Sequence, residues 1–301
     1  METTQISAEV INSAFIDRIE QGHIKEAEEA GSNFIRQKLY EDGFTRRILV
    51  PQTKTAEDLD PEVDSDKPRI LVEKEPDAPA ATFVPFKGTG DRMYFEGNRF
   101  AIPFGKIETE RQTKSKFELM TIRMPIMDWF KQNHVKQIQA VEDGNFIETI
   151  KANIALSAGT RSTSSSSGDS FKTAFTLGLK GLTSLRVPIG CVLMHENTRL
   201  SSLALKTDEI GYKAQDSRFE KGLVDEASFM GYPVVTTIDT DKVAENEMFF
   251  FAPADYLGKF YLLQDATLFI KTEADMYTFH TYEAPGIGIG NVNSCFKVTI
   301  V

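Results

Sequence analysis

The sequence predicts an α+β protein, because helix and strand patterns are mixed along the chain without the regular βαβ alternation of an α/β fold. Two helical patterns lie within residues 5–41, and a longer one extends from Met124 to Ser157. Beyond Pro188 the patterns are mostly those of short strands. A chain of 301 residues with this mixture can bury a substantial core, in one large or two modest domains.

The longest helical pattern is amphipathic. Pro125 stands in the first turn, where a helix tolerates proline. Apolar residues then recur at steps of three and four, and they are Ile126, Phe130, Ile138, Val141, Ile147, Ile150 and Ile154. Their phase slips once at Asp143–Gly144, which predicts a kink or a loosened turn there. At about 1.5 Å per residue the helix spans roughly 45–50 Å and needs a partner along its apolar face.

The composition is that of an ordinary globular protein, with 41% hydrophobic and 26% charged residues. A net charge of −10 argues against tight wrapping of nucleic acid, which requires clustered Lys and Arg. Cys191 and Cys295 are predicted to be buried thiols in a reducing compartment. No apolar run approaches the roughly 18 residues of a membrane span, and the polar N-terminus does not resemble a secretory signal. These features predict a cytoplasmic product.

The N-terminal helical region, residues 5–41, has an apolar stripe on each side of a break at Gly22. Two interpretations are open. The region is either a surface helix pair on its own domain, or an arm whose stripe docks on another subunit. In the second case the docking residues are Ile11, Phe15, Ile19 and Phe34.

Residues 51–85 contain six prolines among many Asp and Glu residues, and Ile70-Leu71-Val72 is the one compact apolar cluster. Because proline removes a backbone donor and fixes φ, this density excludes a helix and disfavours central strands. We predict an extended strap.

Residues 93–124 show alternation of apolar and other residues on both sides of a polar segment, 105–115. Phe100, Ile102 and Phe104 form one side, and Phe117 and Leu119 the other, which predicts a long two-stranded hairpin. Since an isolated hairpin is marginal in water, it needs a partner surface in its own chain or on a neighbour. The predicted contact residues at its tip are Lys106, Glu108, Glu110, Arg111, Lys114 and Lys116.

The segments after the long helix alternate between connectors and short elements. The serine-rich stretch 157–168 predicts an unstructured connector, followed by a helix through Leu185. A short helix is expected over 197–205. Strands are expected over 189–194, 232–238, 247–253, 264–270, 277–282 and 296–301.

No catalytic, cofactor or metal site is predicted. The run Gly286–Gly290 resembles part of a dinucleotide loop, but a strand pattern follows it where a phosphate-binding helix would have to begin. The histidines His23, His134, His195 and His280 are scattered, and His195-Glu196 lacks the second histidine of a zinc-protease helix. A soluble enzyme is therefore the weakest of the alternatives.

The order of several short motifs resembles that of tailed-phage major capsid proteins, which have the HK97-type fold. The motifs are Pro188–Leu205, Gly222-Leu223, Gly231–Val235, Phe250–Pro253 with Leu257-Gly258, Tyr277–Phe279, Gly286–Gly290 and the final strand pattern Phe296–Val301. The resemblance covers about residues 85–301.

The resemblance implies four parts. They are an N-terminal arm and strap (1–85), an extended loop formed by the hairpin (86–123), a peripheral domain with a spine helix (124–185 and 266–301) and an axial domain (186–265).

It further implies a non-enzymatic shell protein without cofactors, which assembles as hexamers and pentamers of identical copies into the icosahedral head around double-stranded DNA. The same resemblance implies scaffold and portal proteins, with or without a decoration protein, as further partners. It also implies weak contact with DNA without sequence preference. The protein is expected in the virion capsid, after assembly in the host cytoplasm. The alternative is an encapsulin-like cellular compartment, which shares the fold and houses enzymes.

Overall fold

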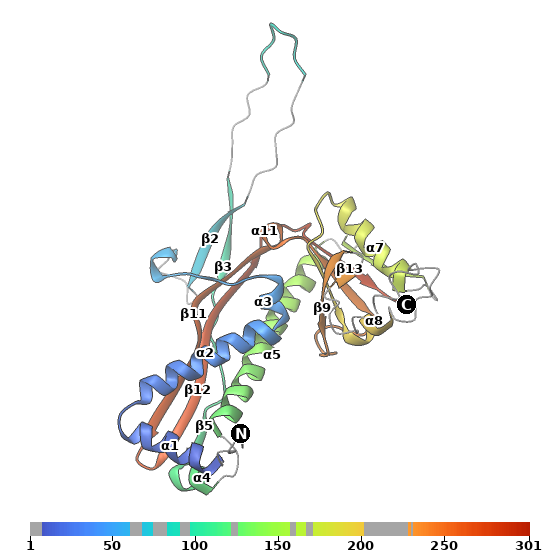
Figure 1. The fold of residues 1–301 in the computed structure, drawn as a ribbon. Coiled ribbons are helices and arrows are strands. Elements are labelled where there is room, and N and C mark those ends of the chain that lie inside the picture. Colours follow the sequence, from blue (N-terminus) through green and yellow to red (C-terminus); the bar gives the residue numbers. More distant parts are fainter. Residues whose placement is uncertain are drawn as a thin grey trace, which may run out of the picture.

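The computed structural model describes residues 8–60, 68–74, 83–90, 97–121, 126–156, 161–166, 171–201, 228–229 and 231–301. Figure 1 shows them as an elongated body, a compact body and a projecting hairpin. Ser7, Met93, Pro125, Gly222-Leu223 and the serines 157 and 167 lie outside the described residues.

The elongated body comprises the described residues of 8–60, 105–156 and 254–290. Its sheet has the order β1-β11-β12-β4, with β5 also paired to β12. The long antiparallel pair β11–β12 forms its centre, and β11 has register irregularities between Leu262 and Thr267. The elements are α1 (Ala8–Glu20), α2 (Ile24–Asp42), α3 (Phe44–Ile48), β1 (Gln52–Thr53), a 3-10 turn η1 (Ala56–Asp58), β4 (Ile107–Glu108), β5 (Gln112–Ser115), α4 (Lys116–Thr121), α5 (Ile126–Ala155), α11 (Ala254–Leu257), β11 (Gly258–Glu273) and β12 (Met276–Ile289).

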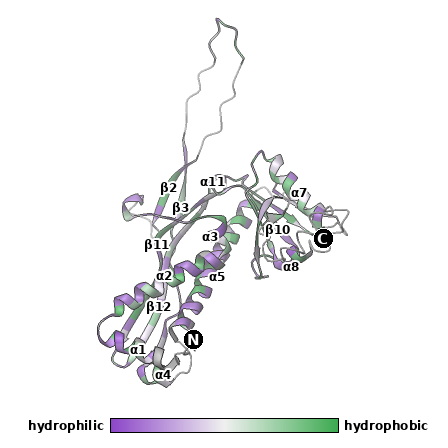
Figure 2. Cartoon of the chain, in the orientation of Figure 1, coloured by the Kyte–Doolittle hydropathy of each residue, from purple (hydrophilic) through white to green (hydrophobic). Residues whose placement is uncertain are grey.

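Helices α2 and α5 pack along this ribbon, α2 on β11 and α5 on β12 (Figure 1). Hydrophilic and hydrophobic residues alternate around both helices, as the sequence periodicity predicts (Figure 2). The predicted break between α1 and α2 is present, and Gly22 adopts a φ of 88° there, which glycine tolerates at little cost.

Helix α5 extends without interruption through Asp143–Gly144, so the predicted loosened turn is absent. The phase slips because the two acidic residues at this point are buried against α3. The Asp143 carboxylate accepts a 3.0 Å hydrogen bond from the Thr45 backbone N–H, and Glu142 pairs with Arg46. The buried side of the helix therefore includes polar residues that an apolar stripe does not reveal.

The compact body comprises the described residues of 161–253 and 291–301. Its sheet has the order β6-β13-β10-β7-β9-β8, and α7 packs across β10 and β13. A Cβ atom on Gly178 of α7 would lie 2.1 Å from the Phe250 ring, so only glycine permits this approach. The elements are β6 (Ser162–Ser164), α7 (Phe171–Ser184), β7 (Cys191–His195), α8 (Glu196–Leu200), β8 (Ser228–Phe229), β9 (Tyr232–Thr237), β10 (Glu247–Phe251) and β13 (Cys295–Thr299).

Two predictions need correction here. The domain division assigns α7 and the last strand to the part with the long helix, whereas both lie with the six-stranded sheet, and the start of β11 lies in the elongated body. The serine-rich connector is not wholly unstructured, because β6 pairs in parallel with β13. Both errors have one cause: sequence order does not show which sheet a strand joins.

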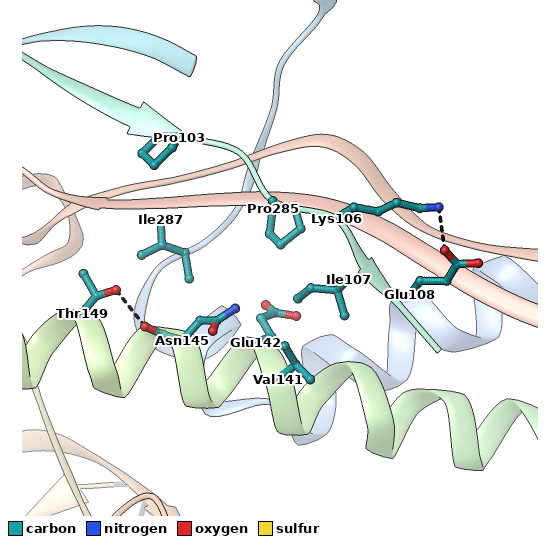
Figure 3. Close-up of a pocket in the computed structure, with 11 residues that line it drawn as sticks. Pro103, Lys106, Ile107, Glu108, Val141, Glu142, Asn145, Thr149, Pro285 and Ile287 are labelled. Atoms are coloured by element: carbon teal, nitrogen blue, oxygen red, sulfur yellow. Dashed lines mark hydrogen bonds and ion pairs between the residues drawn. The ribbon is translucent and has the colours of Figure 1, made fainter. Parts of the chain in front are cut away.

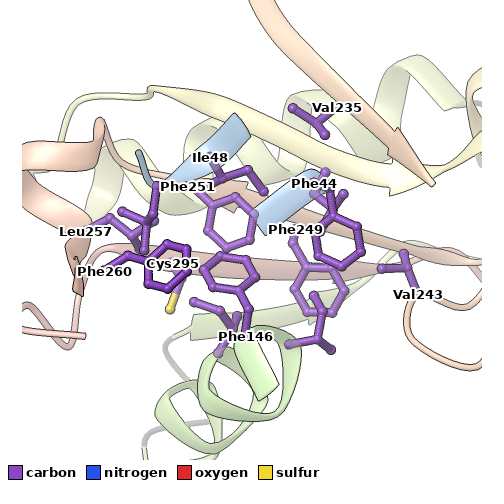
Figure 4. Packing of buried hydrophobic residues seen from close by; sticks show 14 of the residues in the cluster. Phe44, Ile48, Phe146, Val235, Val243, Phe249, Phe251, Leu257, Phe260 and Cys295 are labelled. Atoms are coloured by element: carbon purple, nitrogen blue, oxygen red, sulfur yellow. The ribbon is translucent and has the colours of Figure 1, made fainter. Parts of the chain in front are cut away.

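The two bodies share a hydrophobic core at their junction (Figure 4). Phe44 of α3, Phe146 of α5 and Phe251 of β10 meet there, with ring centroids of Phe44 and Phe146 6.3 Å apart and those of Phe146 and Phe251 5.8 Å apart. Phe249, Leu257 and Phe260 are buried in the same cluster. This shared aromatic core fixes the orientation of the compact body on the elongated one.

Candidate assembly surfaces

The most prominent surface feature is a hairpin that projects from the elongated body (Figure 1). Strands β2 (Arg69–Lys74) and β3 (Asn98–Pro103) pair antiparallel, with Arg69 opposite Pro103 and Lys74 opposite Asn98. Among its described residues, those at the base of the hairpin are packed, in a small cluster of Ile70, Ile102, Phe104 and Tyr261. Because a two-stranded ribbon is marginal in water, the projecting part needs a surface outside this base.

The base of the hairpin rests on glycines of β12. A Cβ atom at Gly288 would lie 2.5 Å from Ile102 Cγ1, and one at Gly286 would lie 2.8 Å from Phe104 Cδ1. At Gly290 the corresponding distance to Phe100 Cζ is 3.0 Å. The glycine run that superficially resembles a dinucleotide loop is therefore a strand segment that admits the hairpin side chains.

The described segment 83–90 lies at the far end of the hairpin (Figure 1). Its side chains Phe83 and Phe86 are fully exposed, at 103% and 112% of the reference area. Two such aromatic side chains at the end of a projection expose apolar surface of the kind that marks a contact site. Phe83 falls at the end of the predicted strap and Phe86 at the start of the predicted extended loop, and no sequence pattern singled out either residue.

The predicted pairing of residues 93–104 with 117–119 is wrong. Strand β3 pairs with β2, which is the apolar cluster Ile70-Leu71-Val72 within the proline-rich strap, and Lys116–Thr121 is helix α4. Residues between them form β4 and β5, which pair with β12. Alternation identified a strand in β3 but could not identify its partner.

The six predicted tip residues therefore lie along the edge of the five-stranded sheet. Glu108 accepts hydrogen bonds from Lys106 at 2.7 Å and Arg111 at 3.3 Å, and these bonds lower the pKa of its carboxyl group. Lys116 pairs with Glu20 of α1, and the Glu110 backbone N–H contacts Gln137 of α5. Lys114 lies opposite Tyr277 in the β5–β12 ladder. All six belong to one body and none lies at the hairpin tip.

The N-terminal helices pack on their own subunit. Ile19 is 4% exposed in a core cluster with Ile16, Ile35 and Leu39, and the half-buried Phe34 packs against that cluster. Of the predicted docking residues, Ile19 is thus unavailable to another subunit; the side chains of Ile11 and Phe15 are outside the described set. The alternative of a helix pair on its own domain is the one that the structure favours.

A buried polar junction joins α3, α5, β11 and β12. Arg46 contacts three carboxylates, with Nε 3.0 Å from Glu142, Nη1 3.2 Å from Asp265 and Nη2 2.8 Å from Glu283. Burial raises the pKa of Glu142 to about 7 and, together with the charge of Glu142, that of Glu283 to about 9. In the sequence, only the phase slip at Asp143–Gly144, next to Glu142, hinted at this junction.

A cavity of about 410 Å³ lies beside this junction, between α5 and the strand β12 (Figure 3). Glu142 and Asn145 point into it from the helix, and Pro285 and Ile287 face them from β12 (Figure 3). Lys106 and Glu108 are joined by an ion pair at its edge. One carboxyl group of the junction, that of Glu142, therefore lines the cavity.

The histidines His134 and His195 make structural contacts within the subunit. His134 is fully buried and contacts the Thr281 hydroxyl at 2.8 Å, and burial lowers its pKa to about 4, so its ring is neutral at neutral pH. His195 caps α8 by accepting a hydrogen bond from the Asn197 N–H. Cys191 and Cys295 are free thiols. Within the described residues no three His, Cys, Asp or Glu side chains are grouped to hold a metal ion, and no helix could cross a membrane.

Comparison with known proteins rests on structure alone, since no profile of a known protein family and no curated protein sequence matches this chain. The chain is similar to the capsid of a native GTA particle, with a TM-score of 0.58 and 14% identity over 85% of this chain and 89% of that chain. It is also similar to the mature capsid of bacteriophage PhiM1, with a TM-score of 0.56 and 9% identity over 86% and 87% of the two chains.

This is the HK97-type capsid fold. A virus-like particle from Pyrococcus furiosus shares it, with a TM-score of 0.50 and 14% identity over 90% of this chain and 98% of that chain. In this chain the elongated body contains the long helix α5, the compact body contains the six-stranded sheet, and the β2–β3 hairpin projects from the elongated body. Identities between 9% and 14% establish the fold, and function requires a separate argument.

Proposed function

We propose that this protein is the major capsid protein of a tailed bacteriophage and that identical copies assemble into the icosahedral head around double-stranded DNA. The observation that carries the proposal is the β2–β3 hairpin, which leaves Phe83 and Phe86 fully exposed beyond a base held by four buried side chains. Within a shell, a neighbouring copy supplies the missing surface. The role is structural, and no cofactor is required.

If every copy repeats the same contact with its neighbour, the copies can close into a ring. A hairpin that reaches from each copy to the next makes a heterologous contact, and heterologous contacts close into rings when the rotation between copies permits. Hexamers and pentamers are the rings that an icosahedral shell combines. Many modest contacts per copy then give the assembly a stability that no single contact has.

Further contacts are proposed for the edge of the five-stranded sheet. The charged residues Lys106, Glu108, Glu110, Arg111, Lys114 and Lys116 lie there, on exposed or half-buried positions, and we assign them to contacts between copies. Scaffold and portal proteins, and possibly decoration proteins, are the expected additional partners. With a net charge of −10, the wall is expected to contact packaged DNA weakly and without sequence preference.

The test is a pair of hairpin variants examined by negative-stain microscopy and light scattering. In the first, residues 75–97 are replaced by an Asn-Gly turn, which closes the ladder where Lys74 faces Asn98. In the second, Phe83 and Phe86 are both changed to Ser. We expect wild-type protein, alone or with its scaffold, to form rings or shells, and both variants to remain small with unchanged helix content by circular dichroism.

A matched control is Val50→Ser, which alters an exposed apolar residue away from the hairpin. It should assemble like the wild type. Strictly monomeric wild-type protein across concentration and salt would refute the shell, and full assembly of both hairpin variants would refute the role of the hairpin. Particles that enclose protein rather than nucleic acid would indicate the alternative, a cellular compartment.

A further inference from the structure

The junction around Arg46 contains more carboxyl groups than cations. Arg46, whose side chain is 1% exposed, contacts Glu142, Asp265 and Glu283. The second cation in contact is Arg36, whose Nε lies 3.6 Å from Asp265 Oδ2. Among the described residues, three carboxyl groups therefore face two guanidinium groups, and full ionisation would leave one negative charge uncompensated at the junction.

The three carboxyl groups differ in how well their charge is stabilised. Asp265 is 25% exposed and contacts both arginines. Both oxygens of Glu142 accept from Arg46 Nε, at 3.0 and 3.2 Å, and this side chain lines the cavity beside the junction. Glu283 is fully buried with one bonded oxygen, and its Oε1 atom has no hydrogen-bond partner among the described residues. An ionised carboxylate is therefore most costly at Glu283.

We propose that Glu283 holds a proton at neutral pH and that this proton acts as a latch, whose loss leaves the junction with excess negative charge and loosens α3 from α5 and β12. With Glu283 neutral, at most two carboxylates, those of Glu142 and Asp265, face the two guanidinium groups. This inference stands independently of the proposed shell function, because it concerns contacts within one subunit.

Other ionisable groups around the junction do not provide the missing compensation. Asp143 on α5 is a further carboxyl group, which accepts a hydrogen bond from the Thr45 N–H, and the cation Lys242, before β10, pairs with Asp239. At the edge of the cavity Lys106 is paired with Glu108. The raised pKa of Glu283, about 9, agrees with a proton retained at neutral pH, and its causes are burial and the charge of Glu142.

The elements that the latch holds connect directly to the hairpin. Arg46 lies on α3, a helix of five residues from which the chain continues through β1 toward β2. Glu283 lies opposite Ile107 of β4, on the same strand that carries Gly286 and Gly288 under the hairpin base. Because the folded-state pKa is raised, the stabilisation is complete below the ordinary carboxyl pKa and is lost as pH rises through about 9.

The first test is infrared difference spectroscopy between pH 8 and pH 10, which serves for free subunits and for particles. The lower pH lies above the pKa of Glu142, about 7, and below that of Glu283. We expect wild-type protein to lose the C=O stretch of a protonated carboxyl group, and Glu283→Gln to lack that band at pH 8. The control Glu108→Gln, at an exposed carboxyl, should keep it. Absence of the band in the wild type, its persistence in Glu283→Gln, or its loss only in Glu142→Gln would overturn the assignment.

The second test is amide hydrogen exchange, corrected for the intrinsic pH dependence of exchange. In wild-type protein, exchange over residues 44–49 and 107–109 should increase by up to about tenfold for each pH unit between the ordinary carboxyl pKa and the pKa of Glu283, and it should level off above about pH 9. In Glu283→Gln, which cannot ionise, the corrected rates should stay constant. Constant rates in the wild type would overturn the latch, even if the glutamine variant failed to fold.

Discussion

Replacing Gly288 by alanine tests whether the hairpin base rests on β12 as described. The new Cβ atom would lie 2.5 Å from Ile102 Cγ1, 2.8 Å from Ile102 Cδ1 and 3.2 Å from Phe100 Cε2. Since ordinary carbon contacts begin near 3.5 Å, the hairpin base must move by about 1 Å or Ile102 must leave its rotamer. Ile102 is fully buried, so it cannot swing into solvent. Overpacking of this kind costs about 1–3 kcal/mol.

The assay is urea unfolding of unassembled subunits, followed by particle yield. Gly105→Ala is the control, because nothing lies within 4 Å of its Cβ position, and its free energy of unfolding should stay within about 0.5 kcal/mol of wild type. Gly290→Ala, with its closest contact at 3.0 Å, should fall between the two. The double variant Gly288→Ala, Ile102→Ala should be less destabilised than the sum of its single changes, because alanine at 102 removes the clash. Equal stability of Gly288→Ala and Gly105→Ala would refute this account of the hairpin base.

Three other predictions concern buried groups. Arg46→Met should lose about 3–5 kcal/mol of stability at pH 8, since it removes the cation that the buried Glu142 carboxylate contacts. The loss should be clearly smaller at pH 5, where Glu142 can take up a proton, and equal losses in urea unfolding at the two pH values would contradict this. Ile150→Asp places a charge at a fully buried position and should cost several kcal/mol, so a soluble variant with a native circular dichroism spectrum and melting temperature would contradict the burial of α5. Burial raises the pKa of Cys191 to about 12 and that of Cys295 to about 11, so a thiol reagent at pH 8 should modify both only after denaturation, and rapid modification of native protein would disprove their protection.

Local periodicity predicted most elements of the fold. Patterns among residues close together in the sequence are enough to predict the apolar stripe of α5, the break at Gly22 and the strands β9 and β10. Strands β11 and β12 are longer than predicted, because their polar residues continue the ladder beyond the apolar segments.

Pairing between distant segments could not be predicted in the same way. Strand β3 has the expected alternation, but its partner β2 lies in a segment whose prolines indicated a strap. Phe117 and Leu119 alternate with other residues as in a strand, but they lie on helix α4. Two apolar residues are too few to distinguish the two-residue period of a strand from the period of about 3.6 residues in a helix. The tip residues were misplaced as a direct consequence.

The candidate site was only partly accessible from sequence. A hairpin in need of a partner surface was expected, whereas Phe83 and Phe86 lie in a segment without periodicity. The charged junction was hidden because Arg46, Glu142, Asp265 and Glu283 are far apart in the chain, and isolated charged residues normally lie at the surface.

The position of β13 has a consequence for the timing of synthesis. This strand lies between β6 and β10 in the six-stranded sheet, yet Ser162 of β6 meets its partner Lys297 only after β11 and β12 have been made. A nascent chain on the ribosome therefore carries the open edge of β10 until residues 295–299 emerge. The compact body then closes in one late step, and a chain cannot offer a finished surface to neighbouring copies before residues 295–299 have been made.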